Sequence, residues 1–396
     1  MAISDNLLLP EGARLVHIGP HKTGSTAIQN ALHESRADLA RHNVHYAGVN
    51  ARPRQAGWAL GIGNPRGGAP RPPIGRWLDL VREVEEAGAQ RVCVSNEDFG
   101  RSATPEQAAK VVQGLGGDAV HVVAVARRLD RYLPSQWQER VKAGQTKSYG
   151  EWLEVVLAEE SDAWDWRNVW RAHDVEALVK RWSAEVGTEN FTLIVTDDTN
   201  RDLLPRTFEQ LLGLPEGLLV VRPEGSNRGL SWGEVEVVRA LNQASKARSW
   251  PRAMHDHFVK RGVVRTLRSL PRSELGARTP PLPTWAVDRV RALADARVES
   301  VNNLGVRVVG DPEALRLPED ASTGSGDDYP PVSVEIAARA IEAVIVEAGK
   351  PSRPRQRARG TRAKAAAEPI QAEVVRMRRL EALARRVTRR LRGARS

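Results

Sequence analysis

The chain has 396 residues, of which 41% are apolar, so it can bury the core of one large domain or of two ordinary ones. Its single cysteine, Cys93, excludes an internal disulfide framework and a multi-cysteine zinc site. The start, MAISDNLLLPEGAR, lacks the pattern of a signal peptide, and no apolar run is long enough to span a bilayer, so we expect a soluble, cytoplasmic protein.

Short apolar runs alternate with helical patterns along the chain. Continuous apolar runs predict buried strands over 14–19, 91–95, 120–125 and 191–195. Apolar residues at helical spacing predict helices over 25–39, 175–182, 231–247, 284–303 and 332–347. We therefore predict an α/β fold, with a doubly wound, mostly parallel sheet, a P-loop-like strand–loop–helix phosphate site and helical additions toward the C-terminus.

The composition also suggests where the domain ends. We predict an α/β domain over 1–317, a flexible linker or surface loop over 318–331, a helix over 332–349 and a basic tail over 350–396. Within the domain, residues 50–75 are crowded with Gly, Pro and Arg, which predicts a long irregular loop.

The segment between the first predicted strand and helix is Gly-Pro-His-Lys-Thr-Gly-Ser-Thr, residues 19–26. Backbone N–H groups at a helix N-terminus have no partner within the helix, and they point at whatever binds there. Gly24 permits close approach of a ligand to the backbone, and Lys22 adds a full positive charge. The pattern predicts an anion-binding loop, with an ordinary strand–turn–helix as the alternative. The candidate ligands are Lys22, Thr23, Gly24, Ser25 and Thr26.

The order of residues in this loop is not that of a Walker A motif. Lys22 precedes Gly24 by two positions, whereas the Walker A lysine follows the last glycine. A P-loop kinase or NTPase is therefore the weaker interpretation.

Residues 20–26, Pro-His-Lys-Thr-Gly-Ser-Thr, resemble the 5′-phosphosulfate loop of sulfotransferases that use 3′-phosphoadenosine-5′-phosphosulfate (PAPS), whose core is Pro-x-Lys-x-Gly-[Ser/Thr]-Thr. Residues 17–29 are similar to the bacterial branch of that family, and the resemblance extends over approximately 14–250. It implies that the loop residues hold the 5′-phosphate of PAPS, and that Lys22 stabilises the bridging oxygen as the S–O bond breaks. No metal is required.

Two further segments resemble the family's contacts to the donor 3′-phosphate. Arg127 follows the third predicted strand and Ser135 comes eight residues later, which is the family spacing; Arg128 replaces Arg127 if the strand ends one residue later. A guanidinium offers phosphate a planar fork of donors. A third contact would use Arg228 and Gly229, although a plain turn in which Ser231 caps the next helix fits this segment equally well.

The base that accepts the acceptor's proton is predicted to be Glu97, which follows the second predicted strand. We expect burial to raise the pKa of this carboxyl toward neutrality. Asp98 is the competing choice, and the structural alternative is that Glu97 caps a helix or pairs with Arg101.

The sequence does not specify the acceptor, which could be a free or lipid-linked glycan, a lipid or a small metabolite. It does not specify the oligomeric state either. The loop over 50–75, with Arg52, Arg54, Arg66 and Trp58, is either an acceptor lid suited to a sugar or an anion, or a mobile loop without contacts. Besides the kinase, a non-catalytic binding protein tethered to a membrane or nucleic acid is a competing function class.

The basic character of the chain belongs to its C-terminal end. The chain has 59 Lys and Arg and 49 Asp and Glu; 16 of the basic and 3 of the acidic residues lie in 350–396, so this tail carries +13 and the remainder −3. We expect disorder over 351–364 and a basic amphipathic helix over 369–392. Such a tail is compatible with binding to the anionic inner face of the cytoplasmic membrane, to another helix or to nucleic acid. It is also compatible with having no function. We slightly favour the membrane.

Overall fold

A computed structural model describes residues 7–65, 69–102, 104–221, 229–270, 277–325 and 330–349. Contacts within the chain divide it into two compact units. The first unit comprises Met1–Arg140, Lys147–Asn227 and Thr279–Asp328. The second comprises Val141–Thr146, Arg228–Arg278 and Tyr329–Ser396.

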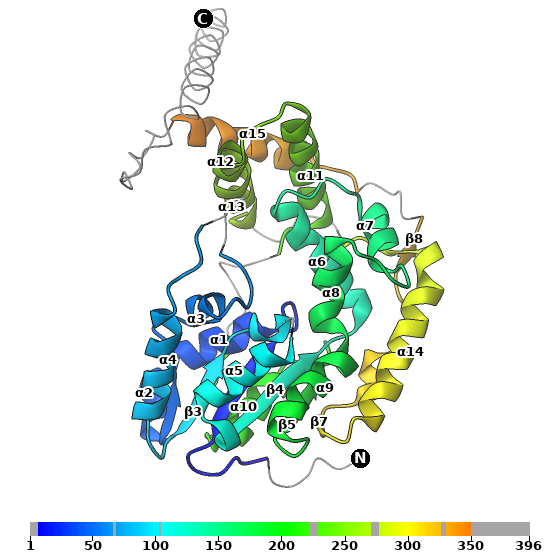
Figure 1. The fold of residues 1–396 in the computed structure, drawn as a ribbon. Coiled ribbons are helices and arrows are strands. Elements are labelled where there is room, and N and C mark those ends of the chain that lie inside the picture. The colour runs from blue at the N-terminus through cyan, green and yellow to red at the C-terminus, as the bar shows by residue number, and fades with distance from the viewer. Residues whose placement is uncertain are drawn as a thin grey trace, which may run out of the picture. The chain divides into compact units, whose positions relative to one another are not determined.

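The described part of the first unit contains a six-stranded sheet in the order β2-β3-β1-β4-β5-β7, and all neighbouring strands in it are parallel (Figure 1). Together with the helices between the strands, this confirms the predicted α/β fold with a mostly parallel sheet. The strands are Arg14–Gly19 (β1), Val44–Tyr46 (β2), Arg91–Ser95 (β3), Val120–Ala126 (β4), Phe191–Val195 (β5) and Arg307–Val309 (β7).

The position of β1 in the sheet determines where a ligand can bind. After β1 the chain forms β2 and β3 on one side of it, and then crosses to form β4, β5 and β7 on the other side. Such a reversal of strand order leaves a crevice outside the carboxyl ends of the strands, where open α/β sheets bind their ligands. The loops after β1, β3 and β4 therefore meet at the expected ligand edge.

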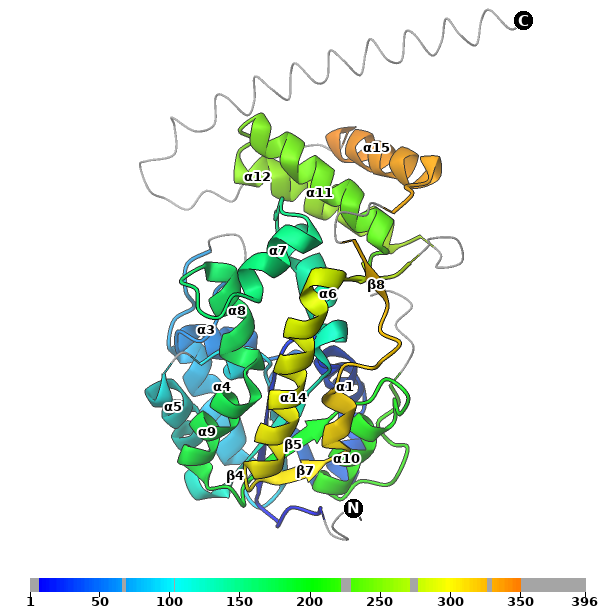
Figure 2. The ribbon, with the colours of Figure 1, turned by 90° about the vertical axis from the view of Figure 1, so that its right-hand side faces the viewer.

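Helices cover both faces of the sheet, which explains why its strands are continuous apolar runs. All seven residues of β4 are buried; Val122 and Ala124 belong to one core cluster, whereas Val123 and Val125 belong to the other. The first cluster is completed by α4 (Gly75–Glu86), α5 (Pro105–Leu115), α9 (Val175–Val186) and α14 (Val287–Asn303), and the second by α1 (Ser25–Glu34), α2 (Arg36–Arg41) and α10 (Leu203–Leu212). Figure 2 shows α14 and α9 along the side of the sheet formed by β4, β5 and β7.

Two local predictions for this unit were wrong. The helix predicted over 25–39 is interrupted at Ser35, which separates α1 from α2. The loop predicted over 50–75 contains a short helix, α3 (Arg54–Ala59). The other α-helices and strands described in the unit are α6 (Leu129–Lys142), whose last two residues fall in the second unit, α7 (Tyr149–Val156), α8 (Trp164–His173), β6 (Leu282–Pro283) and β8 (Thr323–Gly324).

The second unit is helical where it is described. Its α11 (Trp232–Ala247) begins with a capping box, in which the Ser231 side chain accepts from the Glu234 N–H and the Glu234 side chain accepts from the Ser231 N–H. The remaining elements are α12 (Arg252–His255), a π-helix (Asp256–Val264), α13 (Arg265–Arg268) and α15 (Val334–Gly349). No helix in the described ranges is long and apolar enough to cross a membrane.

Candidate functional site

The ends of β1, β3 and β4 bring three predicted site segments to one edge of the sheet. β1 pairs in parallel with β3 on one side and with β4 on the other. A Cβ placed on Gly19 would lie 2.9 Å from the Cβ of Glu97, so the chain after β1 passes directly against the chain after β3. Gly19 also has a φ of 83°, which favours glycine. The phosphate loop and the acidic turn Asn96-Glu97-Asp98 are therefore adjacent.

The phosphate loop is held by hydrogen bonds within itself. The hydroxyls of Thr23 and Ser25 both donate to the carbonyl oxygen of Pro20, at 2.8 and 3.1 Å. Gly24 occupies the N-cap position of α1 in a left-handed conformation, with a φ of 96° and no side chain to cap the helix. Two of the hydroxyls predicted as ligands thus shape the loop, and the start of α1 carries no side-chain cap that would cover its N–H groups. Thr26 lies half-buried in the first turn of α1.

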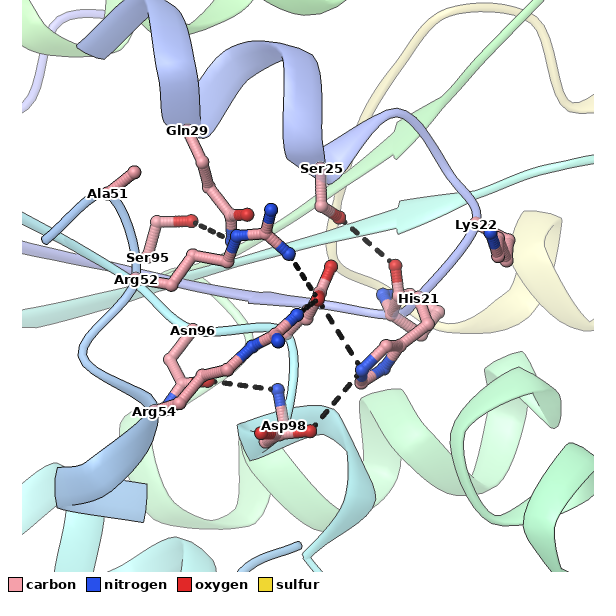
Figure 3. A network of polar contacts seen from close by, with 12 residues as sticks. His21, Lys22, Ser25, Gln29, Ala51, Arg52, Arg54, Ser95, Asn96 and Asp98 are labelled. Atoms are coloured by element: carbon pink, nitrogen blue, oxygen red, sulfur yellow. Dashed lines mark hydrogen bonds and ion pairs between the residues drawn. The ribbon is translucent and has the colours of Figure 1, made fainter. Parts of the chain in front are cut away.

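Lys22 projects away from the acidic turn. Its backbone is left-handed, with a φ of 70°, and its ammonium group donates to Glu139 Oε1 on α6 at 2.5 Å. Figure 3 shows Lys22 apart from the group of side chains around Asp98 and Arg54. Both members of the pair are partly exposed, at 29% and 39%, so the pair can separate at little cost when a ligand offers Lys22 another anion.

Arg127, at the end of β4, contacts the phosphate loop directly. Its Nη1 donates to the carbonyl oxygen of Lys22 at 3.2 Å, and its Nη2 donates to Asp198 Oδ1 at 2.9 Å. Arg128, the alternative ligand, forms a bidentate pair with Asp130 in the first turn of α6. Of the two neighbouring arginines, Arg127 is the one whose guanidinium contacts the phosphate loop.

One stripe of α6 faces this region. Arg131, Ser135 and Glu139 are spaced four residues apart and therefore lie on one side of the helix. The first pairs with Asp198 at 3.0 Å and the last with Lys22, so Ser135 lies on the helix between two side chains that reach the site. Arg127 thus contacts the phosphate loop, and Ser135 lies one helical turn from Glu139, which also contacts it.

The acidic turn after β3 is surrounded by basic side chains (Figure 3). Glu97 Oε1 accepts from Arg54 Nη2 at 2.6 Å and from Arg52 Nη1 at 3.1 Å, and it lies 3.5 Å from His21 Nε2. The same His21 nitrogen lies 3.3 Å from Asp98 Oδ1. The ion pairs of Glu97 are thus with these three residues, and not with Arg101.

These partners reverse the pKa expected for Glu97. Burial raises the pKa of Glu97, but the positive charges of His21, Arg52 and Arg54 outweigh burial and hold it at about 2. The pKa of His21 is itself lowered, by burial first and then by the charge of Arg101, so at neutral pH the two arginines dominate. Our expectation of a raised pKa for Glu97 was wrong in direction, because it considered burial without these charges.

The alternative base, Asp98, is also ionised. Burial raises the pKa of Asp98, but a hydrogen bond and charge from His21, together with Arg101 and Arg54, produce a net lowering. Its Oδ2 accepts from Trp58 Nε1 at 3.1 Å. Neither carboxyl is therefore protonated at neutral pH.

Comparison with solved structures finds distant likenesses to other proteins. No protein-family model and no curated protein matches the chain. The crystal structure of a sulfotransferase from Alicyclobacillus acidocaldarius aligns with 59% of this chain and 93% of its own, with 15% sequence identity and a TM-score of 0.33.

The segment with Arg52 and Arg54 is attached to the acidic turn by its other residues as well. Asn96 Nδ2 donates to the carbonyl oxygen of Pro53 at 3.3 Å, and Trp58 donates to Asp98. The sequence left this segment open as an acceptor lid or as a mobile loop without contacts. It gave no sign that two of its arginines bind Glu97, and it assigned no role to His21. An irregular loop has no periodic sequence pattern, so its sequence does not reveal which residue an arginine in it contacts.

The remaining predicted residues lie elsewhere or beyond the described ranges. Arg228, Arg66 and the tail over 350–396 are outside the described residues. Gly229 belongs to the second unit, next to the Ser231 cap of α11, so the predicted N-cap is confirmed. Among the described residues, no group of three or more His, Cys, Asp or Glu side chains could hold a metal ion.

Proposed function

We propose that this chain is a sulfotransferase that transfers a sulfuryl group from PAPS to a hydroxyl or amine of an acceptor. The observation that carries the proposal is the hydrogen bond of 3.2 Å between Arg127 Nη1 and the carbonyl oxygen of Lys22. Two segments 105 residues apart, each with the features of a phosphate site, adjoin at the ligand edge of one sheet. A nucleotide with a phosphate at each end of its ribose can reach both.

In this proposal, the loop from Lys22 to Thr26 binds the 5′-phosphosulfate, using backbone N–H groups at the start of α1 and the ammonium group of Lys22. Arg127 and Ser135 bind the 3′-phosphate. Sulfuryl transfer then depends mainly on positioning and on stabilising charge, because the acceptor atom must attack sulfur in line with the departing phosphate oxygen. Lys22 leaves Glu139 and neutralises the charge that develops on this oxygen.

Glu97 takes the proton of the acceptor in this mechanism. Its backbone adjoins that of Gly19, at the start of the phosphate loop, and its carboxylate is ionised and 5% exposed. A base must be deprotonated before it can act, and Glu97 meets that condition. With its pKa at about 2, however, it is a weak base until some of the surrounding positive charge is removed.

A sulfate-transfer assay with ³⁵S-labelled PAPS and a panel of sugars, lipids and small hydroxyl compounds tests this function. We expect the wild-type chain to label an acceptor without added metal, and Lys22→Ala to reduce transfer by about a hundredfold or more, as loss of one electrostatic contact to a transition state does. Full activity in Lys22→Ala would refute the mechanism. Mg²⁺-dependent ATP turnover without sulfate transfer would favour the kinase or NTPase instead.

A further inference from the structure

One oxygen of the candidate base is approached by two guanidinium groups and an imidazole. Arg54, Arg52 and His21 approach Glu97 Oε1 at 2.6, 3.1 and 3.5 Å. A carboxylate in this state has little tendency to take a proton, because a proton on it would be repelled by each neighbouring charge. The arrangement is therefore unsuited to a base unless something else takes over the guanidinium groups.

The two arginines are placed where an incoming molecule can reach them. The side chain of Glu97 is 5% exposed, whereas those of Arg52 and Arg54 are 24% and 22% exposed. The arginines therefore lie closer to solvent than the carboxylate that they bind. In addition, Arg54 Nε is buried and has no hydrogen-bond partner among the described residues. A buried donor without a partner is costly, and an acceptor group on a ligand would satisfy it once the side chain has turned toward solvent.

The backbone that carries the arginines has attachments of its own. The bond from Asn96 to the Pro53 carbonyl and the bond from Trp58 to Asp98 both hold this segment beside the acidic turn. Gly57 is packed so closely that a Cβ there would lie 2.8 Å from Asn96 Nδ2. The arginine side chains can consequently turn away from Glu97 while the segment itself stays in place.

We infer, building on the proposed function, that Arg52 and Arg54 form an anion subsite for the acceptor. The acceptor then carries an oxyanion (a carboxylate, a phosphate ester or a sulfate ester) beside its reacting hydroxyl. Guanidinium forks match the geometry of such groups and bind them in bidentate fashion. The acceptor's anion replaces Glu97 as the partner of one or both arginines.

This exchange couples recognition of the acceptor to its activation. When the guanidinium groups turn to the acceptor, the pKa of Glu97 rises, because fewer positive charges stabilise its ionised form. Glu97 then takes the proton of the reacting hydroxyl. The acceptor oxygen forms a bond to sulfur, and the bond from sulfur to the phosphate oxygen breaks, leaving its electron pair on the phosphate. A neutral acceptor leaves Arg52 and Arg54 on Glu97 and reacts slowly.

Binding of matched sugars to the full-length chain, saturated with 3′-phosphoadenosine-5′-phosphate (PAP), tests the inference. The anionic probes are methyl glucuronide, glucose 6-phosphate and glucose 6-sulfate, and the neutral probe is methyl glucoside. Binding is followed by the ¹⁵N signals of the arginine side chains. We expect at least one anionic sugar to bind about tenfold or more tighter than the neutral sugar and to shift the signals of Arg52 and Arg54.

Variants separate a binding role from a structural one. The double variant Arg52→Ala/Arg54→Ala is expected to lose the preference for the anionic sugar. Arg52→Lys/Arg54→Lys keeps both positive charges and replaces the alanine variant if that variant does not fold. It is expected to retain part of the preference for the anionic sugar. Arg71→Ala/Arg76→Ala also removes two positive charges, from exposed positions, and is expected to leave the preference for the anionic sugar unchanged.

Equal binding of anionic and neutral sugars, or an anion preference that survives Arg52→Ala/Arg54→Ala, would overturn the inference. Binding of PAP is measured first and separately. If PAP does not bind, the proposed function fails. The sugars are then titrated into the nucleotide-free chain, and their relative affinities test the anion subsite independently.

Discussion

The ion pairs of Glu97 should make a measurable contribution to stability, which Glu97→Gln removes. In the folded chain the pKa of Glu97 is about 2, against an ordinary value of 4.5. Each pKa unit corresponds to about 1.36 kcal/mol, so the charged form contributes about 3 kcal/mol to the free energy of unfolding at neutral pH. Because this carboxyl is only 5% exposed, solvent screening reduces the figure little.

The contribution has a defined dependence on pH. Since the folded-state pKa of Glu97 is lower than the unfolded-state value, the unfolded chain binds more protons between these two pKa values. The stabilisation is therefore complete above about pH 5 and is lost as the pH falls toward 2. Glutamine does not titrate, so wild type and Glu97→Gln should differ by about 3 kcal/mol at pH 7 and converge near pH 2.

Urea unfolding followed by circular dichroism at pH values from 2 to 8 measures this difference, with midpoints compared between variants. Glu85→Gln, at an exposed position of α4, is the control and should shift stability by less than about 0.5 kcal/mol at any pH. Curves for wild type and Glu97→Gln that run parallel from pH 7 to pH 3 would refute the reasoning, because the arginines would then not hold the pKa down.

Three further predictions concern the donor site and the tail. Glu139→Gln releases Lys22 from its ion pair and should tighten PAP binding by up to several-fold in calorimetry, since partly exposed pairs contribute about 1 kcal/mol or less; weaker binding would show that the pair supports the site. Arg127→Ala should weaken PAP by about tenfold to a hundredfold while leaving 5′-AMP almost unaffected, and an equal loss for both nucleotides would argue against a 3′-phosphate contact. Deletion of 350–396 should leave PAP affinity unchanged but abolish salt-dependent binding to anionic vesicles, and unchanged vesicle binding would exclude the tail as a membrane contact.

The sequence reveals those parts of this fold that depend on local pattern. Buried strands such as β4 consist mostly of valine and alanine, because both faces of the sheet are covered. The short strands β2 and β7 have three residues each, too few for a periodic pattern, and they were not predicted. The interruption at Ser35 was missed because no glycine or proline marks it.

The site was predictable where it depends on a strand–loop–helix motif and not where it depends on contacts between distant segments. The sequence singled out Lys22 and Arg127 as candidates because each follows a predicted strand with a recognisable spacing. The bonds from Arg52 and Arg54 to Glu97 join residues more than forty positions apart, through a segment without a regular pattern. Because the sequence did not reveal these two arginines, burial alone indicated a raised pKa for Glu97, and the predicted direction of the shift was wrong.

Calorimetric titration of the full chain with PAP, compared with 5′-AMP and 3′-AMP, tests the central claim most directly. If two adjoining anion sites bind the two ends of one nucleotide, PAP should bind in a one-to-one complex, at least about tenfold tighter than either monophosphate. Affinities for all three nucleotides that are equal, or binding too weak to measure, would contradict the account.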